Sequence, residues 1–305
     1  MKNSYKNCSW SKYNKNLINR GSITFCISKD SLKKWKFKSD KKHIGRPFLY
    51  SDDAILLANT VRYVYNLPLR ALEGFLNSIF SILNLSILSP SYTQICKRSK
   101  NLRLSSQLKK RKKITDIIFD ASGLKVYGEG EWKVRTHGTS KRRGWRKIHL
   151  GICPKTQEIL LSDLTKNTCS DIDVMIDLLS NTSFSIDKVY GDGLYDAERI
   201  YKTIYKLGGD AIIPIKKNVL YRQPSKPWMK YRDEQLNIIK GLGGDDLARS
   251  IWKKLKNYHR RSLVETAFSR WKKILGASLK SRKMENQIIE SQIKCLILNK
   301  MIMAN

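Results

Sequence analysis

Three acidic residues stand far apart in the sequence, in settings that could bring their side chains together: Asp120, Asp192 and Glu265. Asp120 ends a short apolar run typical of a strand, and Asp192 stands between two glycines just after another such run. Residues at the carboxyl ends of neighbouring strands meet in one crevice of an open sheet, where two carboxylates repel each other unless a cation lies between them. The first two acids therefore predict a metal site.

The third acid belongs to a segment with helical spacing. At about 100° per residue, four residues fall within an arc of roughly 60° on one helix face: Tyr258, Arg261, Glu265 and Lys272. Arg261 could pair with Glu265, while Lys272, about 10 Å along the helix from Glu265, is better placed for a phosphate than for a metal. An amphipathic helix whose polar stripe faces water would show the same spacing, so the geometry alone leaves both interpretations open.

The region from residue 113 onward has the pattern of a mixed sheet flanked by helices. Apolar runs and two-residue alternation predict strands at residues 114–120, 145–152, 159–164, 188–190 and 211–215. Ser170 and Asp173 predict a capping box that opens one helix, and a second helix, over residues 197–207, ends at Gly208. The order β-β-β-α-β-α-β predicts an α/β fold, a ribonuclease H-like mixed sheet with flanking helices. Pro214 weakens only the last strand.

The N-terminal half has a different character. Residues 51–112 predict a small module of short helices, in which residues 69–80 form the second helix and Lys97 and Arg98 lie on a third that begins near Ser91. The pattern fits a helix-turn-helix-like DNA-binding module and a helical dimerisation module about equally well. Residues 1–50 predict a basic arm ahead of it, and residues 113–305 the sheet-containing domain.

The charge of the whole chain is strongly positive. Its 305 residues include 59 Lys and Arg against 26 Asp and Glu, a formal net charge of +33. Neutralisation of nucleic-acid phosphates is the natural explanation, although a uniformly lysine-rich surface would give the same total. Six cysteines without C-x-x-C spacing indicate reduced thiols rather than a zinc site. The sequence shows neither a signal peptide nor an apolar run near the roughly 20 residues of a membrane span, so we expect a cytoplasmic protein.

The spacing of the helical segment is also recognisable. Tyrosine, two residues, arginine, three residues, glutamate, six residues and lysine resembles the C-terminal motif of the DDE transposases of bacterial insertion sequences, in families four and five. Further stretches are similar to family five: residues 45–47, 50–52, 67–70, 73–75, 120–132, 141–147 and 191–196. The resemblance thus runs from about residue 20 to the C-terminus.

This resemblance implies a transposase that binds the terminal inverted repeats of its own element, cleaves DNA by metal-activated water and joins the 3′-hydroxyl ends to target DNA. Asp120, Asp192 and Glu265 would be both the catalytic and the metal-binding residues of a DDE catalytic domain, with two Mg²⁺ or Mn²⁺ ions expected. The implied partners are double-stranded DNA and further copies of the chain, as a homodimer or higher oligomer in a nucleoid-associated DNA complex.

Further residues could bind or position the DNA. Besides the tyrosine, arginine and lysine of the motif, the candidates are basic residues on the predicted hairpin and on the third N-terminal helix: Arg142, Arg143, Arg146, Lys147, Lys97 and Arg98. A hairpin in contact with water is nearly as good an explanation for the first four. Residues 92–98, and Ile215 with Lys216, depart from the family's usual sequence, which puts the details of end recognition in doubt.

Several alternatives remain open. Asp116 shares strand parity with Asp120 and is a second candidate for the first acid. Asp196 and Glu198 are expected to cap the next helix, and Trp228 to anchor a loop rather than stack on a base. A decayed or domesticated copy that binds DNA without catalysis would show salt-sensitive binding and no metal-dependent cleavage. A nuclease of the same fold that never joins strands is a third possibility, which a strand-transfer assay separates.

Overall fold

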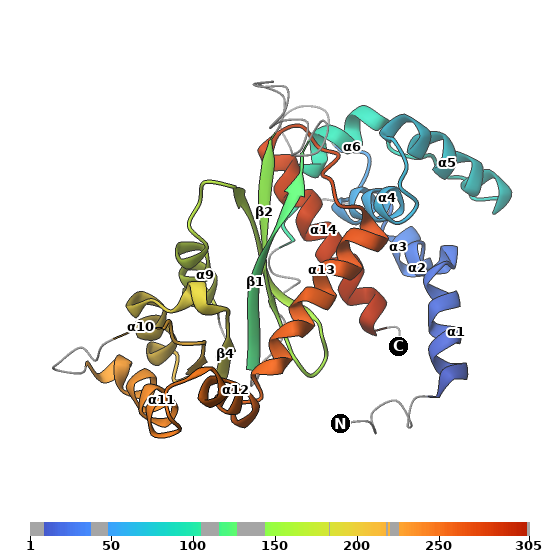
Figure 1. Cartoon of the computed structure of the whole chain (residues 1–305). Coiled ribbons are helices and arrows are strands. Elements are labelled where there is room, and N and C mark those ends of the chain that lie inside the picture. The colour runs from blue at the N-terminus through green and yellow to red at the C-terminus, as the bar shows by residue number, and fades with distance from the viewer. Residues whose placement is uncertain are drawn as a thin grey trace, which may run out of the picture. The chain divides into compact units, whose positions relative to one another are not determined.

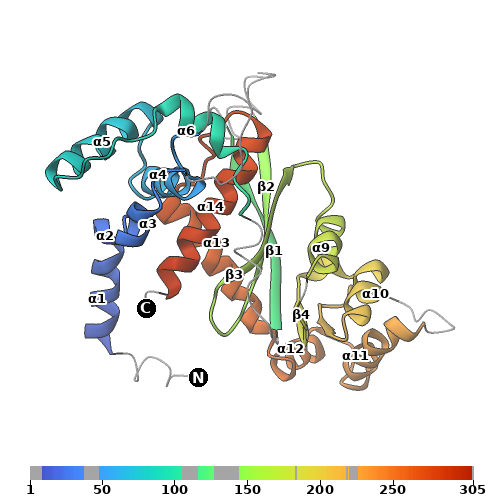
Figure 2. The ribbon, with the colours of Figure 1, turned by 180° about the vertical axis from the view of Figure 1, so that it is seen from behind.

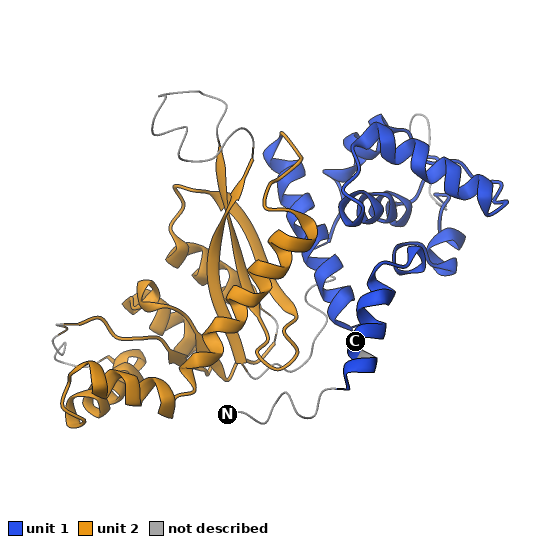
Figure 3. Ribbon diagram, turned by 45° about the vertical axis from the view of Figure 1, so that its right-hand side comes forward, with its two compact units in different colours: residues 1–104, 283–305 blue, residues 105–282 orange. Residues whose placement is uncertain are grey.

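The computed structural model describes residues 9–37, 48–104, 116–126, 144–182, 184–217, 219 and 226–303. The chain divides into two compact units, one of residues 1–104 with 283–305 and one of residues 105–282 (Figure 3). Residues 283–305 thus group with the N-terminal helices, whereas the sequence-based division places them in the sheet-containing domain. The predicted division into 1–50, 51–112 and 113–305 otherwise stays a prediction.

The unit of residues 105–282 is built on a five-stranded mixed sheet in the order β3-β2-β1-β4-β5. The strands are β1 Asp116–Lys125, β2 Trp145–Ile152, β3 Ile159–Lys166, β4 Lys188–Tyr190 and β5 Asp210–Ile212. β1, β2 and β3 pair antiparallel, whereas β4 pairs parallel with both β1 and β5. The α/β mixed sheet with flanking helices, predicted from the strand and helix order, is confirmed.

Helices cover both faces of this sheet. α9, Asp171–Ser180, and α10, Glu198–Lys206, lie on one side of β1, and α13, Ser262–Leu275, lies on the other (Figures 1 and 2). Ile117 and Phe119 of β1 belong to the buried core shared with α9 and α10. Because successive side chains of a strand point to opposite faces, Asp120 points toward the face that α13 covers.

Two strand ends differ from the predictions. β1 continues to Lys125, so Asp120 lies in the middle of the strand, opposite Leu150 of β2, and not at its end. The apolar run stops at Phe119, but backbone pairing with β2 continues through the smaller residues that follow, which the apolar pattern cannot indicate. β5 ends at Ile212, before Pro214, since proline has no N–H to donate to the sheet.

The N-terminal ends of two helices also differ from the predictions, one in its cap and one in its helix type. α9 begins where predicted, but the Ser170 side chain makes no capping hydrogen bond, so the predicted capping box is wrong. A complete capping box instead joins Ser91 and Gln94 at the start of α6, Tyr92–Ser99. The predicted helix through residues 258–272 begins with a 3₁₀ turn, Tyr258–Arg261, and becomes α-helical only at α13. Asn257, in the left-handed region with φ 53°, sets this turn off from the preceding helix.

A helical segment joins β5 to this turn. It contains a 3₁₀ turn at Pro227–Met229 and the helices α11, Lys230–Gly241, and α12, Asp246–Leu255. Trp252 of α12 is buried, and its indole N–H donates to the Gln235 side chain of α11 at 3.1 Å. A satisfied buried tryptophan of this kind ties the two helices into one body.

The other unit is helical in the part of the chain that the structure describes. Its helices are α1 Trp10–Arg20, α2 Ile23–Cys26, α3 Lys29–Lys33, α4 Asp52–Val64, α5 Leu69–Ile82, α6 Tyr92–Ser99 and α14 Met284–Met303. The buried Trp35 ring packs edge-on against Phe80 at 5.2 Å, and its N–H donates to the Leu88 carbonyl at 2.9 Å. The predicted short helices of residues 51–100 are therefore present, while their role in DNA binding stays a prediction. Within the described residues, no helix is long and apolar enough to span a membrane.

Candidate active site

Alternate residues along one face of β1 each contact a basic residue from the segment that begins with the 3₁₀ turn. The three contacts are Asp116 with Arg260 at 3.3 Å, Asp120 with Arg261 at 2.8 Å and Ser122 with Lys272 at 2.7 Å. Strand periodicity places all three β1 residues on the same face, and the 3₁₀ turn and α13 together supply the residues that cover it. The strand and the helix thus form one polar seam with the motif residues on one side and β1 on the other.

Arg261 joins two of the three predicted acids. One terminal nitrogen donates to Asp120 Oδ2 at 2.8 Å, and the other donates to Glu265 Oε1 at 2.7 Å. The predicted Arg261–Glu265 pair is therefore confirmed. The two acids differ in setting, since the Asp120 side chain is 16% exposed and the Glu265 side chain 58% exposed.

Asp192 is held at the start of the turn that follows β4. Its Oδ1 accepts the backbone N–H of Leu194 at 2.9 Å, which caps the 3₁₀ turn Gly193–Tyr195. Neither neighbouring glycine has a positive φ. Gly191 is required for a different reason: a Cβ there would come within 3.0 Å of the Tyr195 ring.

The pKa of Asp120 responds to the other two acids. Burial is the main cause that raises this pKa above its usual value, and the negative charges of Asp192 and Glu265 raise it further. The N–H of Ala121 and the charge of Arg261 oppose this rise without cancelling it. A carboxylate whose pKa is raised by neighbouring negative charges lies in a site that favours bound positive charge.

Tyr258 borders the same site. Its pKa rises to about 12, mainly by burial, so that its hydroxyl keeps its proton at neutral pH. Arg261 lowers this pKa, and the three acids raise it, which places the tyrosine in their common field. Its ring also packs against Trp252 at 6.1 Å, so α12 holds the tyrosine in place.

The donor set suits a hard divalent cation, but a protein cation already bonds two of its members. In the part of the chain that the structure describes, no three acidic, histidine or cysteine side chains are grouped so as to hold a metal ion. The Arg261 guanidinium bonds Asp120 and Glu265, two of the three acids. Carboxylate oxygens are the ligands that Mg²⁺ and Mn²⁺ prefer, so the chemistry of Asp120, Asp192 and Glu265 suits such an ion.

The structure does not bring every predicted DNA-positioning residue to this site. Lys147 donates to Asp171 at 2.7 Å and to the Cys169 carbonyl at 3.0 Å, so it is tied to the start of α9 on the opposite face of the sheet. Arg146 donates to the Trp145 carbonyl at 3.1 Å. Arg142 and Arg143 lie outside the described residues.

The two predicted DNA contacts of the N-terminal helices have different settings. Lys97 is exposed on α6. Arg98 instead donates to the Tyr50 carbonyl and to Asp52, and its guanidinium stacks over Phe48 at 4.5 Å from the ring centre. Arg98 therefore stabilises its own unit, and its role in DNA binding stays a prediction.

The contacts of Asp116 and Trp228 bear on the two alternatives for these residues, a first catalytic acid and a loop anchor. Asp116 is buried and pairs with Arg260. It precedes Asp120 by four residues on β1, so the two residues are about 13 Å apart along the strand. The distance separates it from the field of the three acids. Trp228 donates to Glu198 at 3.2 Å, as expected of a loop anchor.

Asp196 does not cap α10, contrary to the prediction. Its carboxylate accepts two hydrogen bonds from Arg232, at 2.8 and 3.1 Å, and a third from the Tyr201 hydroxyl at 3.0 Å. Burial alone would raise the pKa of Asp196, but these bonds and one from the Lys216 N–H lower it. This buried pair fastens α11 to α10 and so supports the helical segment that holds Tyr258.

Sequence reasoning missed Ser122 and Arg260. Ser122 lies two residues after Asp120 on the same face of β1, which becomes evident only when the strand continues beyond Phe119. Arg260 lies next to the motif arginine but falls outside the arc calculated for a continuous α-helix, so only the 3₁₀ turn makes its contact with Asp116 understandable.

Comparison with protein families decides what this site belongs to. Residues 111–300 match the profile of a family described as "Transposase DDE domain", and residues 18–129 match a second profile with the same description. The chain belongs to the DDE transposases. The protein is therefore an enzyme of the DDE transposase type.

Solved structures similar to this DDE transposase include two transposase complexes. The piggyBac transposase synaptic complex with hairpin DNA has a TM-score of 0.46 and 7% identity, over 95% of this chain and 74% of that one. The Drosophila P element transposase strand transfer complex has a TM-score of 0.33 and 11% identity, over 93% and 70%. TM-scores below 0.5 do not establish a shared fold, so the family profiles carry the assignment.

Proposed function

We propose that this DDE transposase binds the terminal inverted repeats of its own bacterial insertion sequence, of family five, cleaves DNA there and joins the 3′-hydroxyl ends to target DNA. Asp120, Asp192 and Glu265 are the proposed catalytic and metal-binding residues. The observation that carries this proposal is the fork of Arg261 between Asp120 and Glu265, in a field that Asp192 shares. One acid from the middle of β1, one from the turn after β4 and one from α13 lie in the field of one positive charge.

The proposed cofactor is a pair of Mg²⁺ or Mn²⁺ ions. When bound, such ions lower the pKa of an attacking water and offset the negative charge of a leaving 3′ oxygen. In the protein, Asp120 and Asp192 are held by the sheet and its following turn, and Glu265 by α13. These elements are proposed to keep the three carboxylates near one another while the DNA is cleaved and joined.

Other residues of the seam are proposed to position the DNA. Lys272 donates to Ser122 at 2.7 Å, which orients its ammonium group along β1 beside the acids. A lysine held this way can bind a DNA phosphate without competing for the metal ligands. Arg261, once released from the acids, is available for a second phosphate. The acting species is proposed to be a homodimer or higher oligomer on double-stranded DNA.

A cleavage assay with the element's own ends tests this function. We expect the purified protein to nick end DNA with Mg²⁺, and Asp192→Asn to lose the activity at least about a hundredfold, since a metal-binding carboxylate is removed. Asp177→Asn, the same change at an exposed position of α9, should cleave like the wild type. Equal cleavage by wild type and Asp192→Asn would overturn the proposal. Salt-sensitive DNA binding without cleavage by the wild type would instead identify a catalytically inactive DNA-binding derivative.

A further inference from the structure

One segment of the helical unit carries no charge at all. Residues 74–96, which run from α5 into α6 (Figure 1), contain no Lys, Arg, Asp or Glu, although 28% of the chain is charged. Large apolar side chains are nevertheless exposed there: Ile82 is 78%, Leu83 53% and Leu88 71% exposed. Apolar side chains exposed together, with no charged neighbours in the sequence, are typical of a surface that contacts another protein.

The backbone that carries Leu88 is held in place. Its carbonyl accepts the indole N–H of Trp35 at 2.9 Å, and the next N–H, that of Ser89, donates to the Asn77 side chain at 2.8 Å. Trp35 is only 2% exposed, so these bonds tie the segment to the core of the helical unit. An exposed side chain on a fixed backbone loses little conformational entropy when a partner covers it.

The lack of charge decides which partner this surface suits. DNA phosphates require Lys or Arg, and an acidic protein would find no opposite charge here. A second copy of the chain has the reverse requirement, because two copies with a net charge of +33 repel each other. Salt screens charges over about 8 Å, so the repulsion between copies is smallest when the surfaces in contact carry no charge.

We propose that Ile82, Leu83 and Leu88 form a self-association surface through which two copies of this chain contact each other. This deepens the proposed function and rests on it for the role in transposition, since it names a surface for the homodimer or higher oligomer. The association itself requires neither DNA nor metal.

The size of the surface sets the strength of the contact. Three side chains bury much less than the roughly 800 Å² per partner of a stable interface, so the association is weak between free copies. Two copies bound to one DNA molecule have a high effective concentration, which strengthens the same contact. The surface therefore favours pairing of copies that are already on DNA.

Sedimentation equilibrium of the nuclease-treated protein in EDTA tests the proposal without DNA. We expect the association constant of the wild type to rise at least about threefold between about 0.15 and 1 M NaCl, because salt screens the repulsion between copies. Binding to DNA would weaken over the same range. Leu88→Lys should lower the association constant at least about tenfold, since it places like charges opposite each other in the contact.

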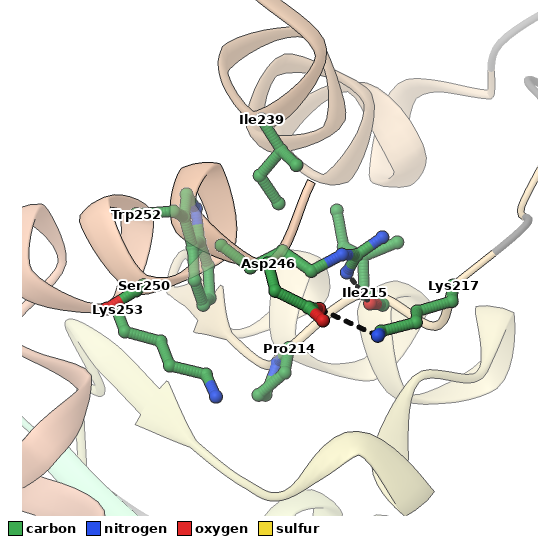
Figure 4. Close-up of a pocket in the computed structure, with 9 residues that line it drawn as sticks. Pro214, Ile215, Lys217, Ile239, Asp246, Ser250, Trp252 and Lys253 are labelled. Carbon is green, nitrogen blue, oxygen red and sulfur yellow. Dashed lines mark hydrogen bonds and ion pairs between the residues drawn. The ribbon is translucent and has the colours of Figure 1, made fainter. Parts of the chain in front are cut away.

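Leu247→Lys is the matched control. Leu247 of α12 is 67% exposed, nearly as much as Leu88, but its surroundings are charged. Its neighbour Asp246 pairs with Lys217 at 2.7 Å, and Lys253 lies on the same helix (Figure 4). Both variants add one positive charge to the chain, so they change the overall repulsion equally. Leu247→Lys should therefore alter the association constant less than about twofold.

A mixture of opposite charges distinguishes a lost contact from a misfolded variant. Leu88→Asp alone should also associate weakly. In a twofold contact both copies use the same surface, so Leu88→Asp and Leu88→Lys bring unlike charges together. We expect their equimolar mixture to associate at least about threefold more strongly than either variant alone, a recovery that misfolding cannot produce.

Three results would overturn the proposal. They are a wild type that stays monomeric at every salt concentration, equal weakening by Leu88→Lys and Leu247→Lys, and a mixture that associates no better than its components. Failure of the proposed function is distinct from these results. A wild type that associates as expected but never cleaves end DNA would contradict the proposed function alone.

Discussion

Removal of the Arg261 guanidinium should tighten metal binding at the three acids. Arg261 donates to Asp120 at 2.8 Å and to Glu265 at 2.7 Å, so a metal ion that takes these oxygens must displace it. Arg261→Met keeps much of the side-chain length and removes both hydrogen bonds and the charge. The variant therefore separates competition with the metal from support of the acids.

The size of the effect follows from the exposure of the two acids. A hydrogen bond to a charged group contributes about 1.5 to 3 kcal/mol when buried, whereas an exposed ion pair contributes about 0.2 to 1 kcal/mol. The Asp120 pair, with side chains 24% and 16% exposed, lies near the lower end of the first range. The Glu265 pair, with its acid 58% exposed, lies in the second. Water that hydrates the released guanidinium offsets part of the lost interaction energy. We therefore expect displacement of Arg261 to cost metal binding about 1 to 2 kcal/mol in the wild type, so that the variant binds the metal about 5- to 30-fold more tightly.

Mn²⁺ binding provides the assay, with the free ion followed by electron paramagnetic resonance in the absence of DNA. Arg260→Met is the matched control, since it removes an adjacent arginine that pairs with Asp116 instead of the three acids. Its affinity should stay within about threefold of the wild type, because only a distant charge is lost. Circular dichroism establishes that both variants are folded. Weaker or unchanged Mn²⁺ binding by folded Arg261→Met would refute the reasoning and show that Arg261 holds the acids in place for the metal.

Three other predictions concern activity, packing and pH. Ser122→Ala removes the acceptor that holds Lys272 at 2.7 Å, and we expect end cleavage to slow about threefold to tenfold in a kinetic assay, with urea unfolding little changed. Gly209→Ala would place a Cβ 3.0 Å from a backbone carbonyl and should lower the free energy of unfolding by about 1 to 3 kcal/mol. Gly74→Ala on α5 meets nothing within 4 Å and should raise it by about 0.5 to 1 kcal/mol, so one urea series tests both and the reverse order would contradict the packing argument. The pKa of Asp196 would be raised by burial but is lowered by its hydrogen bonds; its stabilising effect is thus present above the unfolded-state pKa and is lost as pH falls through the lowered value. Asp196→Asn should therefore be less stable than wild type at neutral pH and lose less stability toward acid, and parallel losses would argue against a stabilising role for the carboxylate.

Much of the sheet could be predicted from the sequence because its information is local. Two-residue alternation marks β2, an apolar run marks the start of β3, and the glycines after Leu207 mark the end of α10. The Arg261–Glu265 pair was predictable for the same reason, since residues four apart on a helix are neighbours.

The remaining features depend on contacts between distant parts of the chain. The length of β1 beyond Phe119 is set by pairing with β2, because residues 121–123 carry small side chains with no apolar pattern. Asp196 and Arg232 are 36 residues apart, and nothing in the local sequence of either indicates the other. A carboxylate just ahead of a helix therefore resembled a cap, while the fold uses it as one half of a buried ion pair.

The 3₁₀ turn gives two adjacent arginines different acidic partners. A 3₁₀ turn places successive residues about 120° apart, so Arg260 and Arg261 diverge and reach Asp116 and Asp120, about 13 Å apart along β1. Arg260 bonds Asp116, whose side chain is only 9% exposed. Burial raises the pKa of Asp116, and the charges of Lys188 and Arg260 oppose this rise. Arg261 bonds Asp120 and Glu265, two of the proposed metal ligands, whose negative charge a divalent cation would also neutralise. We therefore expect a bound metal ion to compete with Arg261 and not with Arg260.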